Sequence, residues 1–145
     1  MQVATNNRLD KGLYFENLDL LIPWNTSLRA ISKFGHPQIL RHSKQRTDAI
    51  WKDVIIFGGH KLDIKAMFWR TLFFDRRLRH LYTYLSSLET VEQLKSHLDN
   101  YFGVTHKKKT ISDYEFYYEW TVDKCKVKVG QGDRSGSYYY LTIDK

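Results

Sequence analysis

The chain of 145 residues has a single cysteine, Cys125, and only two prolines. One cysteine cannot form a disulfide within the chain, so a packed core must hold the fold. No stretch of the sequence comes close to the run of about 18 apolar residues that a membrane-spanning helix needs. The first residues, 1–7, lack the apolar run of a secretory signal. We therefore expect a cytoplasmic protein in a reducing compartment, with no membrane partner.

The sequence motifs of common enzymes are also missing. The six histidines are scattered, without the helical spacing or partner cysteines of a metal site. No G-x-S-x-G nucleophile motif occurs. The glycine-containing stretch 130–136 lies between two predicted strands, whereas a phosphate site would need it to open a helix. Cys125 alternates with valines, which predicts a buried side chain. We expect no catalytic residue, no metal and no cofactor, and hence no enzyme.

Positive charge and aromatic side chains are in excess. The chain has 23 Lys and Arg against 16 Asp and Glu, a formal net charge of +7. Such a charge favours anionic partners, namely nucleic acid, an anionic membrane surface or an acidic protein, although it also serves solubility alone. Ten Tyr and four Trp exceed what a core of this size needs. Some rings are therefore expected on a partly exposed face.

The first half of the chain predicts a short helix followed by strands. Apolar residues spaced by three indicate a helix over 28–34, which Gly35 ends. Residues 38–48 are polar and favour a loop or irregular strand. Strand-like runs follow at 49–57, 62–68 and 78–85. Gly58-Gly59 predicts a hairpin, and a second turn is expected near Asp75-Arg76.

The second half shows the same order. Thr90 and Gln93 match a capping box for a helix that ends at Gly103. Residues 104–113 and 130–136 are expected to be loops, with a turn at Asp123-Lys124. Strand-like alternation covers residues 114–121, 125–129 and 138–143.

Together these patterns predict an α+β fold in a single domain, residues 1–145. The domain would consist of two similar helix-plus-three-stranded antiparallel sheet units, a pseudo-repeat of residues 13–85 and 86–145. The units can join into one continuous sheet with helices on one face. Antiparallel sheets tolerate an uncovered second face, so that face would be available for binding.

The repeated order of helix, glycine and three antiparallel strands resembles the tandem architecture of the β-lactamase inhibitor protein and of small helix-plus-sheet bacterial lipoproteins. The stretch Ile22-Pro23-Trp24-Asn25-Thr26-Ser27-Leu28 and the helix exit Gly35-His36-Pro37 carry this likeness, within residues 20–143. The chain departs from the inhibitor in lacking its disulfides. The resemblance implies a sheet that binds a protein. The size and the lack of motifs are also similar to those of cytoplasmic toxin-immunity proteins.

We therefore expect a non-catalytic protein-binding module, an inhibitor or immunity protein that neutralises an acidic effector toxin by occluding its site. The residues expected to bind the partner are Tyr117, Glu119, Lys126, Lys128, Arg134 and Tyr139, with Arg134 in a rim loop. Nucleic acid is the alternative partner, because lysines interleaved with tyrosines on a sheet can neutralise phosphates and stack bases. Against it, Glu115 and Glu119 are expected on the same surface, where they would repel a phosphate backbone.

Overall fold

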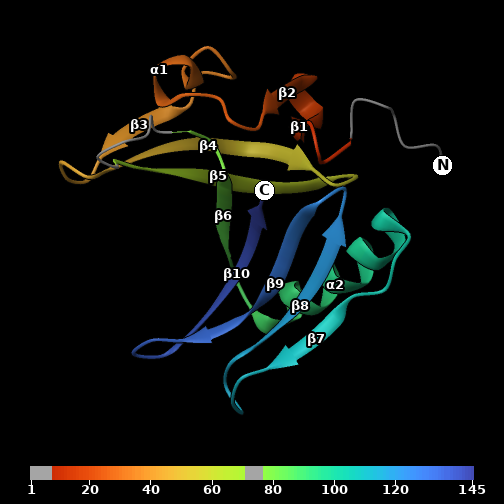
Figure 1. Ribbon diagram of the computed structural model, residues 1–145. Coiled ribbons are helices and arrows are strands. Elements are labelled where there is room, and N and C mark those ends of the chain that lie inside the picture. Colours follow the sequence, from red (N-terminus) through yellow and green to blue (C-terminus); the bar gives the residue numbers. More distant parts are fainter. Residues whose placement is uncertain (1–7, 71–76) are drawn as a thin grey trace.

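The computed structural model describes residues 8–70 and 77–145 and is dominated by one antiparallel sheet (Figure 1). The sheet has eight strands in the order β3-β4-β5-β6-β10-β9-β8-β7. Their bounds are Gln38–Arg41 (β3), Arg46–Ile56 (β4), His60–Trp69 (β5), His80–Leu85 (β6), Lys107–Thr110 (β7), Phe116–Val122 (β8), Cys125–Asp133 (β9) and Ser137–Asp144 (β10). The turn expected near Asp75-Arg76 lies outside the described residues.

Smaller elements accompany this sheet. A two-stranded sheet pairs β1 (Gly12–Phe15) with β2 (Leu20–Pro23), and the short 3-10 helix η2 (Glu16–Leu18) joins them. The α-helices among the described residues are α1 (Leu28–Ile31) and α2 (Leu88–Phe102). Neither has the length and hydropathy that a bilayer-crossing helix requires.

The mixed, mainly antiparallel character of the fold is confirmed, but the structure does not show two equal helix-plus-three-strand units. Four strands, β3 to β6, come from the first half, and four, β7 to β10, from the second. The helices are unequal, since α1 has 4 residues and α2 has 15. Every residue of β3 and β7 is exposed. These two edge strands therefore lack the apolar alternation by which the other strands were recognised, and they fall within segments that were predicted to be irregular.

Both α1 and α2 are preceded by an N-cap serine that the sequence pattern did not single out. The Ser27 hydroxyl accepts a hydrogen bond from the Ala30 amide at 3.2 Å, and Ser87 does the same for Thr90. The capping box predicted at Thr90 is thus wrong, because α2 starts at Leu88. The predicted end of α2 is confirmed: Gly103 has a φ of 70°, a left-handed conformation that favours glycine.

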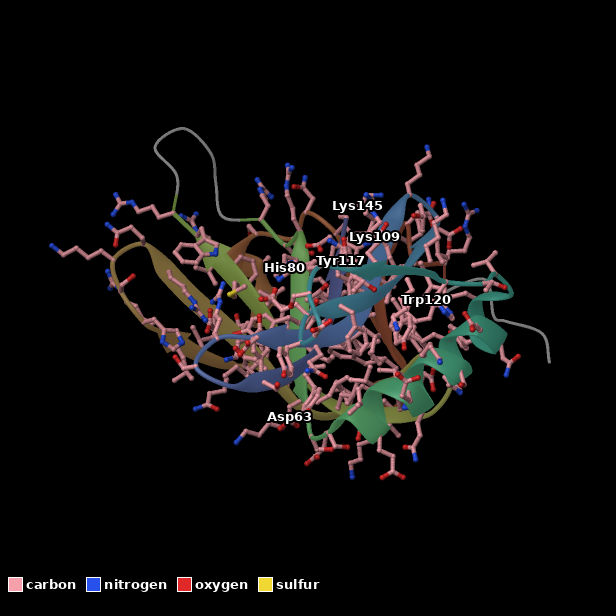
Figure 2. The ribbon with its side chains drawn as sticks, turned by 90° about the horizontal axis from the view of Figure 1, so that it is seen from below. Asp63, His80, Lys109, Tyr117, Trp120 and Lys145 are labelled. Carbon is pink, nitrogen blue, oxygen red and sulfur yellow. The ribbon has the colours of Figure 1, made fainter. Side chains whose placement is uncertain are left out.

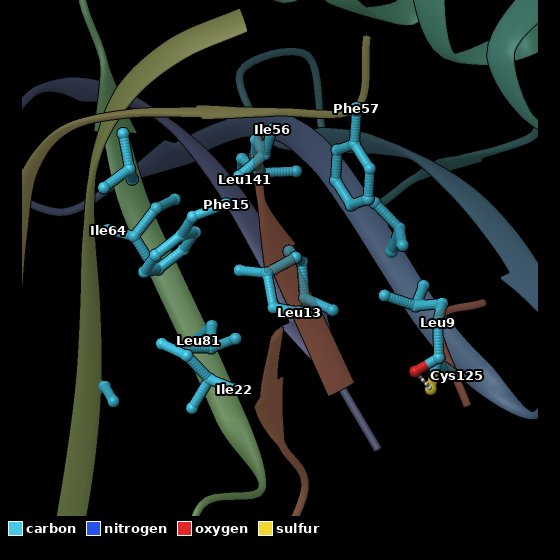
Figure 3. Close-up of a cluster of buried hydrophobic side chains, with 14 of the residues drawn as sticks. Leu9, Leu13, Phe15, Ile22, Ile56, Phe57, Ile64, Leu81, Cys125 and Leu141 are labelled. Atoms are coloured by element: carbon cyan, nitrogen blue, oxygen red, sulfur yellow. Dashed lines mark hydrogen bonds between the residues drawn. The ribbon is translucent and has the colours of Figure 1, made fainter. Parts of the chain in front are cut away.

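The core lies on one face of the sheet. In β9, Cys125, Val127 and Val129 alternate towards it, and α2 covers this region with Val91, Leu94 and Leu98, all buried in the same cluster. The small β1-β2 sheet covers another part, where Leu13 and Ile22 lie among Ile64, Leu81 and Leu141 (Figure 3). Cys125 is fully buried as predicted, and burial raises the pKa of its thiol.

The large sheet turns sharply where its halves meet. Strands β5 and β6 pair through Lys65↔Tyr82 and Ala66↔Leu81 alone, whereas β6 and β10 pair over six positions. Beyond this short seam, β4 and β5 run across the direction of β6 to β10 (Figure 1). The seam brings the face of β4-β5 that points away from the core next to the tyrosines of β6.

Candidate functional site

The face of the large sheet that points away from the core, here called the outer face, carries a row of polar and aromatic side chains across six strands. Because residues paired directly across strands point to the same face, the pairing registers of the strands define this row. It runs Lys65, Tyr82, Thr142, Lys128, Glu119, Lys107 from β5 to β7. The neighbouring row runs Tyr84, Tyr140, Gly130, Tyr117, Lys109 from β6 to β7.

Five tyrosines dominate the outer face, and we call them the tyrosine platform: Tyr82, Tyr84, Tyr117, Tyr138 and Tyr140. The Tyr82 and Tyr84 ring centroids are 5.6 Å apart, those of Tyr84 and Tyr138 are 6.3 Å apart, and those of Tyr138 and Tyr140 are 5.8 Å apart. Tyr84 is 64% exposed. Four of the rings, those of Tyr82, Tyr84, Tyr138 and Tyr140, therefore form a continuous series of contacts in which Tyr84 is well exposed.

Two glycines of β9 give the rings room. A Cβ atom on Gly132 would lie 2.2 Å from Cζ of Tyr138, so this ring extends over the strand where a side chain would stand. A Cβ on Gly130 would lie 2.3 Å from the carbonyl oxygen of Phe116. Gly130 pairs with both Tyr117 and Tyr140, and burial raises the pKa of Tyr140 to about 12, which keeps its hydroxyl neutral.

A buried carboxylate with lysines marks one end of the platform. Glu119 is 8% exposed, and its carboxylate oxygens lie 3.8 Å from Nζ of Lys109 and 4.0 Å from Nζ of Lys128. Nζ of Lys128 also lies 4.9 Å from the ring centroid of Tyr117, within the range of a cation–π contact. Lys107 pairs with Glu119 across the strands. The cluster thus carries more positive than negative charge.

A similar cluster lies at the other end, across the seam. Asp48 is fully buried and accepts two hydrogen bonds from Arg46, at 2.9 and 2.8 Å. His42 Nε2 lies 2.8 Å and Lys65 Nζ 4.0 Å from the same carboxylate. Lys65 Nζ stands 5.1 Å from the ring centroid of Tyr82. Burial alone would raise the pKa of Asp48, but the hydrogen bonds and charge of Arg46, with the other cations, lower it below its usual range.

The structure brings four of the six predicted binding residues together on the outer face. Tyr117, Glu119, Lys126 and Lys128 share it, and Figure 2 places Tyr117 with Lys109 away from α2, towards which Trp120 lies. Arg134 is exposed in the β9–β10 turn, as expected for a rim residue.

Tyr139 does not belong to this face, and its grouping with the others is wrong. It pairs with Leu85 and Gln131 and packs partly buried against the core. Since Leu141 and Ile143 are buried, strand alternation places Tyr139 on their side and its neighbours Tyr138 and Tyr140 on the other. The apolar pair in β10 was the sequence signal that could have identified the two platform tyrosines.

Polar clusters also lie on the covered side of the sheet. Asp99 of α2 accepts hydrogen bonds from the Trp120 indole, the His106 backbone amide and His106 Nδ1, each at 3.0 Å. Tyr118 donates to Glu92 at 2.7 Å. These contacts tie α2 to β8 and the start of β7, so they serve the fold. No group of three His, Cys, Asp or Glu side chains in residues 8–70 and 77–145 is arranged to hold a metal ion.

No protein-family model, curated protein or solved structure matches this chain. Function is therefore inferred from the outer face itself. Its rings can make broad apolar contact, and its lysines and arginine can pair with anionic groups at the rim of that contact.

Proposed function

We propose that the protein is a non-catalytic, cytoplasmic binding protein whose tyrosine platform docks onto an acidic protein, in the manner of an inhibitor or immunity protein that occludes an effector's site. The observation that carries this proposal is a series of contacting tyrosine rings together with two lysine–tyrosine contacts on the same face, Lys65 over Tyr82 and Lys128 over Tyr117. Tyrosine gives contact area at a small cost in side-chain entropy, which explains its enrichment at binding hot spots.

The platform also suits occlusion, because it lies on strands. Its residues come from β6, β8 and β10, whose hydrogen-bonded partners on both sides fix the spacing of the rings. A rigid array loses little conformational freedom on binding. Both halves of the chain contribute to the platform. Tyr82 and Tyr84 come from the first half, and the other platform tyrosines come from the second.

The test compares two tyrosines of nearly equal exposure. Tyr84 is 64% exposed on the platform, and Tyr114 is 63% exposed before β8. We expect Tyr84→Ala to weaken binding of an acidic protein captured from the native host by more than about 1 kcal/mol, or roughly fivefold in Kd. Tyr114→Ala is expected to leave the Kd unchanged. Equal effects of the two substitutions, or none from Tyr84→Ala, would remove the platform from the interface.

Nucleic acid remains a second candidate, and one contact favours it. Glu119, which was expected to repel a phosphate backbone, is almost buried and lies near two lysines. A nucleic-acid binder would bind generic oligonucleotides with an affinity that falls steeply with salt. A binder of one acidic protein would instead retain its defined partner in the presence of excess oligonucleotide.

A further inference from the structure

The outer face repeats one arrangement of charges on both sides of the platform. At each end a buried carboxylate lies near a lysine, and that lysine stands over a tyrosine ring. At one end these are Asp48, Lys65 and Tyr82; at the other they are Glu119, Lys128 and Tyr117. We infer that these ends are two anion subsites, which together bind two carboxylate groups of a single acidic partner.

Each end has positive charge beyond what its own carboxylate neutralises. Arg46 and Lys65 face the single charge of Asp48, and Lys109 and Lys128 face the single charge of Glu119. The Lys65 and Arg46 side chains are each 26% exposed, and that of Lys128 is 32% exposed. The cations are therefore accessible from solvent while the carboxylates below them are not. An incoming carboxylate meets a net positive charge at each end.

The buried carboxylates act on the partner through the cations. Asp48 fixes the guanidinium of Arg46 with two hydrogen bonds, and Glu119 lies between the ammonium groups of Lys109 and Lys128. A lysine on an open strand normally samples many rotamers, and holding it in place lowers the entropy that binding must remove. Asp48 and Glu119 are thus positioning residues for the two subsites.

The strand order sets the separation of the subsites. Lys65 on β5 and Lys128 on β9 are three strand steps apart, through β6 and β10. At about 4.8 Å a step, this is about 14 Å along the sheet. Four of the platform tyrosines, Tyr82 and Tyr84 of β6 and Tyr138 and Tyr140 of β10, occupy the interval. A partner with two acidic groups at this separation and apolar surface between them would complement the face. This inference depends on the proposed function, because it names the groups by which the acidic partner is recognised.

The experiment uses two fluorescently labelled peptides on the full chain. The first has two Glu-Glu pairs joined by a linker of about six Gly and Ser residues, whose mean span is about 14 Å. The second has the same length, with one pair replaced by Gln-Gln. Fluorescence anisotropy at low ionic strength gives both Kd values. We expect the two-pair peptide to bind about tenfold more tightly or better, because the second contact becomes intramolecular.

Four variants locate the effect. Lys65→Gln and Lys128→Gln should each remove the advantage of the two-pair peptide, and Lys65→Arg should retain it. Lys124→Gln removes the same charge from the exposed β8–β9 turn and should leave the advantage intact. Thermal unfolding shows whether each variant is folded. If Lys65→Gln does not fold, Lys128→Gln still tests whether the advantage depends on a second subsite.

Three results would overturn the inference or its basis. Equal Kd values for the two peptides, or an advantage that survives Lys65→Gln, would exclude paired subsites while leaving the proposed function to the Tyr84 test. Oligothymidylate of similar length that displaces the two-pair peptide more effectively than unlabelled peptide would instead assign the face to nucleic acid. That last result would overturn the proposed function as well.

Discussion

Asp99 offers the sharpest test of how α2 is held to the sheet. Its carboxylate accepts the Trp120 indole N–H at 3.0 Å, and Trp120 is only 1% exposed. Asp99→Ala would leave that buried donor without its acceptor, at about 1–3 kcal/mol. It also removes the bonds from His106, which are charge-assisted but partly solvated, since the Asp99 side chain is 28% exposed. We expect a loss of about 3 kcal/mol in the free energy of unfolding.

A double-mutant cycle separates this effect from general damage. Trp120→Phe removes the indole donor and keeps most of the apolar ring. In that background Asp99→Ala should cost about 1–2 kcal/mol less than in the wild type, because no buried donor is left unpaired. Urea unfolding followed by circular dichroism gives each free energy, provided that the m-value stays constant. A coupling energy below about 0.5 kcal/mol would show that the hydrogen bond between Trp120 and Asp99 does not hold α2 to the sheet.

The same carboxylate has a predictable pH signature. Burial alone would raise the pKa of Asp99, but hydrogen bonds from His106 and Trp120 lower it below its usual range. A carboxyl group with a lowered folded pKa stabilises the fold above its unfolded pKa of about 3.9, and this stability is lost as the pH falls through the folded value. The acid limb of the unfolding profile should therefore be shallower in Asp99→Ala than in the wild type.

Three further predictions concern single positions. Burial, and then the charge of the neighbouring His97, lower the pKa of His60, so stability should decline as the pH falls below about 6.5 and should decline less in His60→Gln, as thermal midpoints across that range will show. Burial raises the pKa of Tyr140 to about 12, so an ultraviolet titration at about pH 11 should show no loss of tyrosinate signal in Tyr140→Phe; a full residue's loss would contradict this. Gly130→Ala should cost about 1–3 kcal/mol in urea unfolding because its Cβ would meet backbone, and Gly132→Ala should cost less because the ring end of Tyr138 can move, so the reverse order would disprove this account.

The sequence was informative where apolar alternation is strong. Cys125, Val127 and Val129 predicted β9 and its buried side, and the apolar face of the second helix predicted Leu94 and Leu98 in the core. In β9 the apolar residues recur every second position, and in the helix they recur every three or four positions, so each pattern indicates one secondary structure. The antiparallel sheet and much of its strand content could therefore be derived from the residues alone.

Other parts could not be derived, for identifiable physical reasons. Edge strand β7 consists of Lys107-Lys108-Lys109-Thr110, whose exposed side chains give no alternation. The seam at Lys65 and Tyr82 depends on pairing between distant segments, which local patterns do not encode. The position of Asp48 beneath Arg46 likewise comes from tertiary packing. Half of the candidate site was thus accessible from alternation, and the part across the seam was not.

The two ends of the large sheet differ in how they discourage unwanted growth. A free edge is a template on which another copy can stack, and cells must prevent such ribbons from lengthening into fibrils. At β7, consecutive lysines would force like charges together if two copies met there. At β3, which is as short as β7, the strand follows Pro37, which has no amide hydrogen to donate to a further strand. Chemical acetylation of the lysines would remove the charge repulsion at β7 and leave that edge protected by its short length alone.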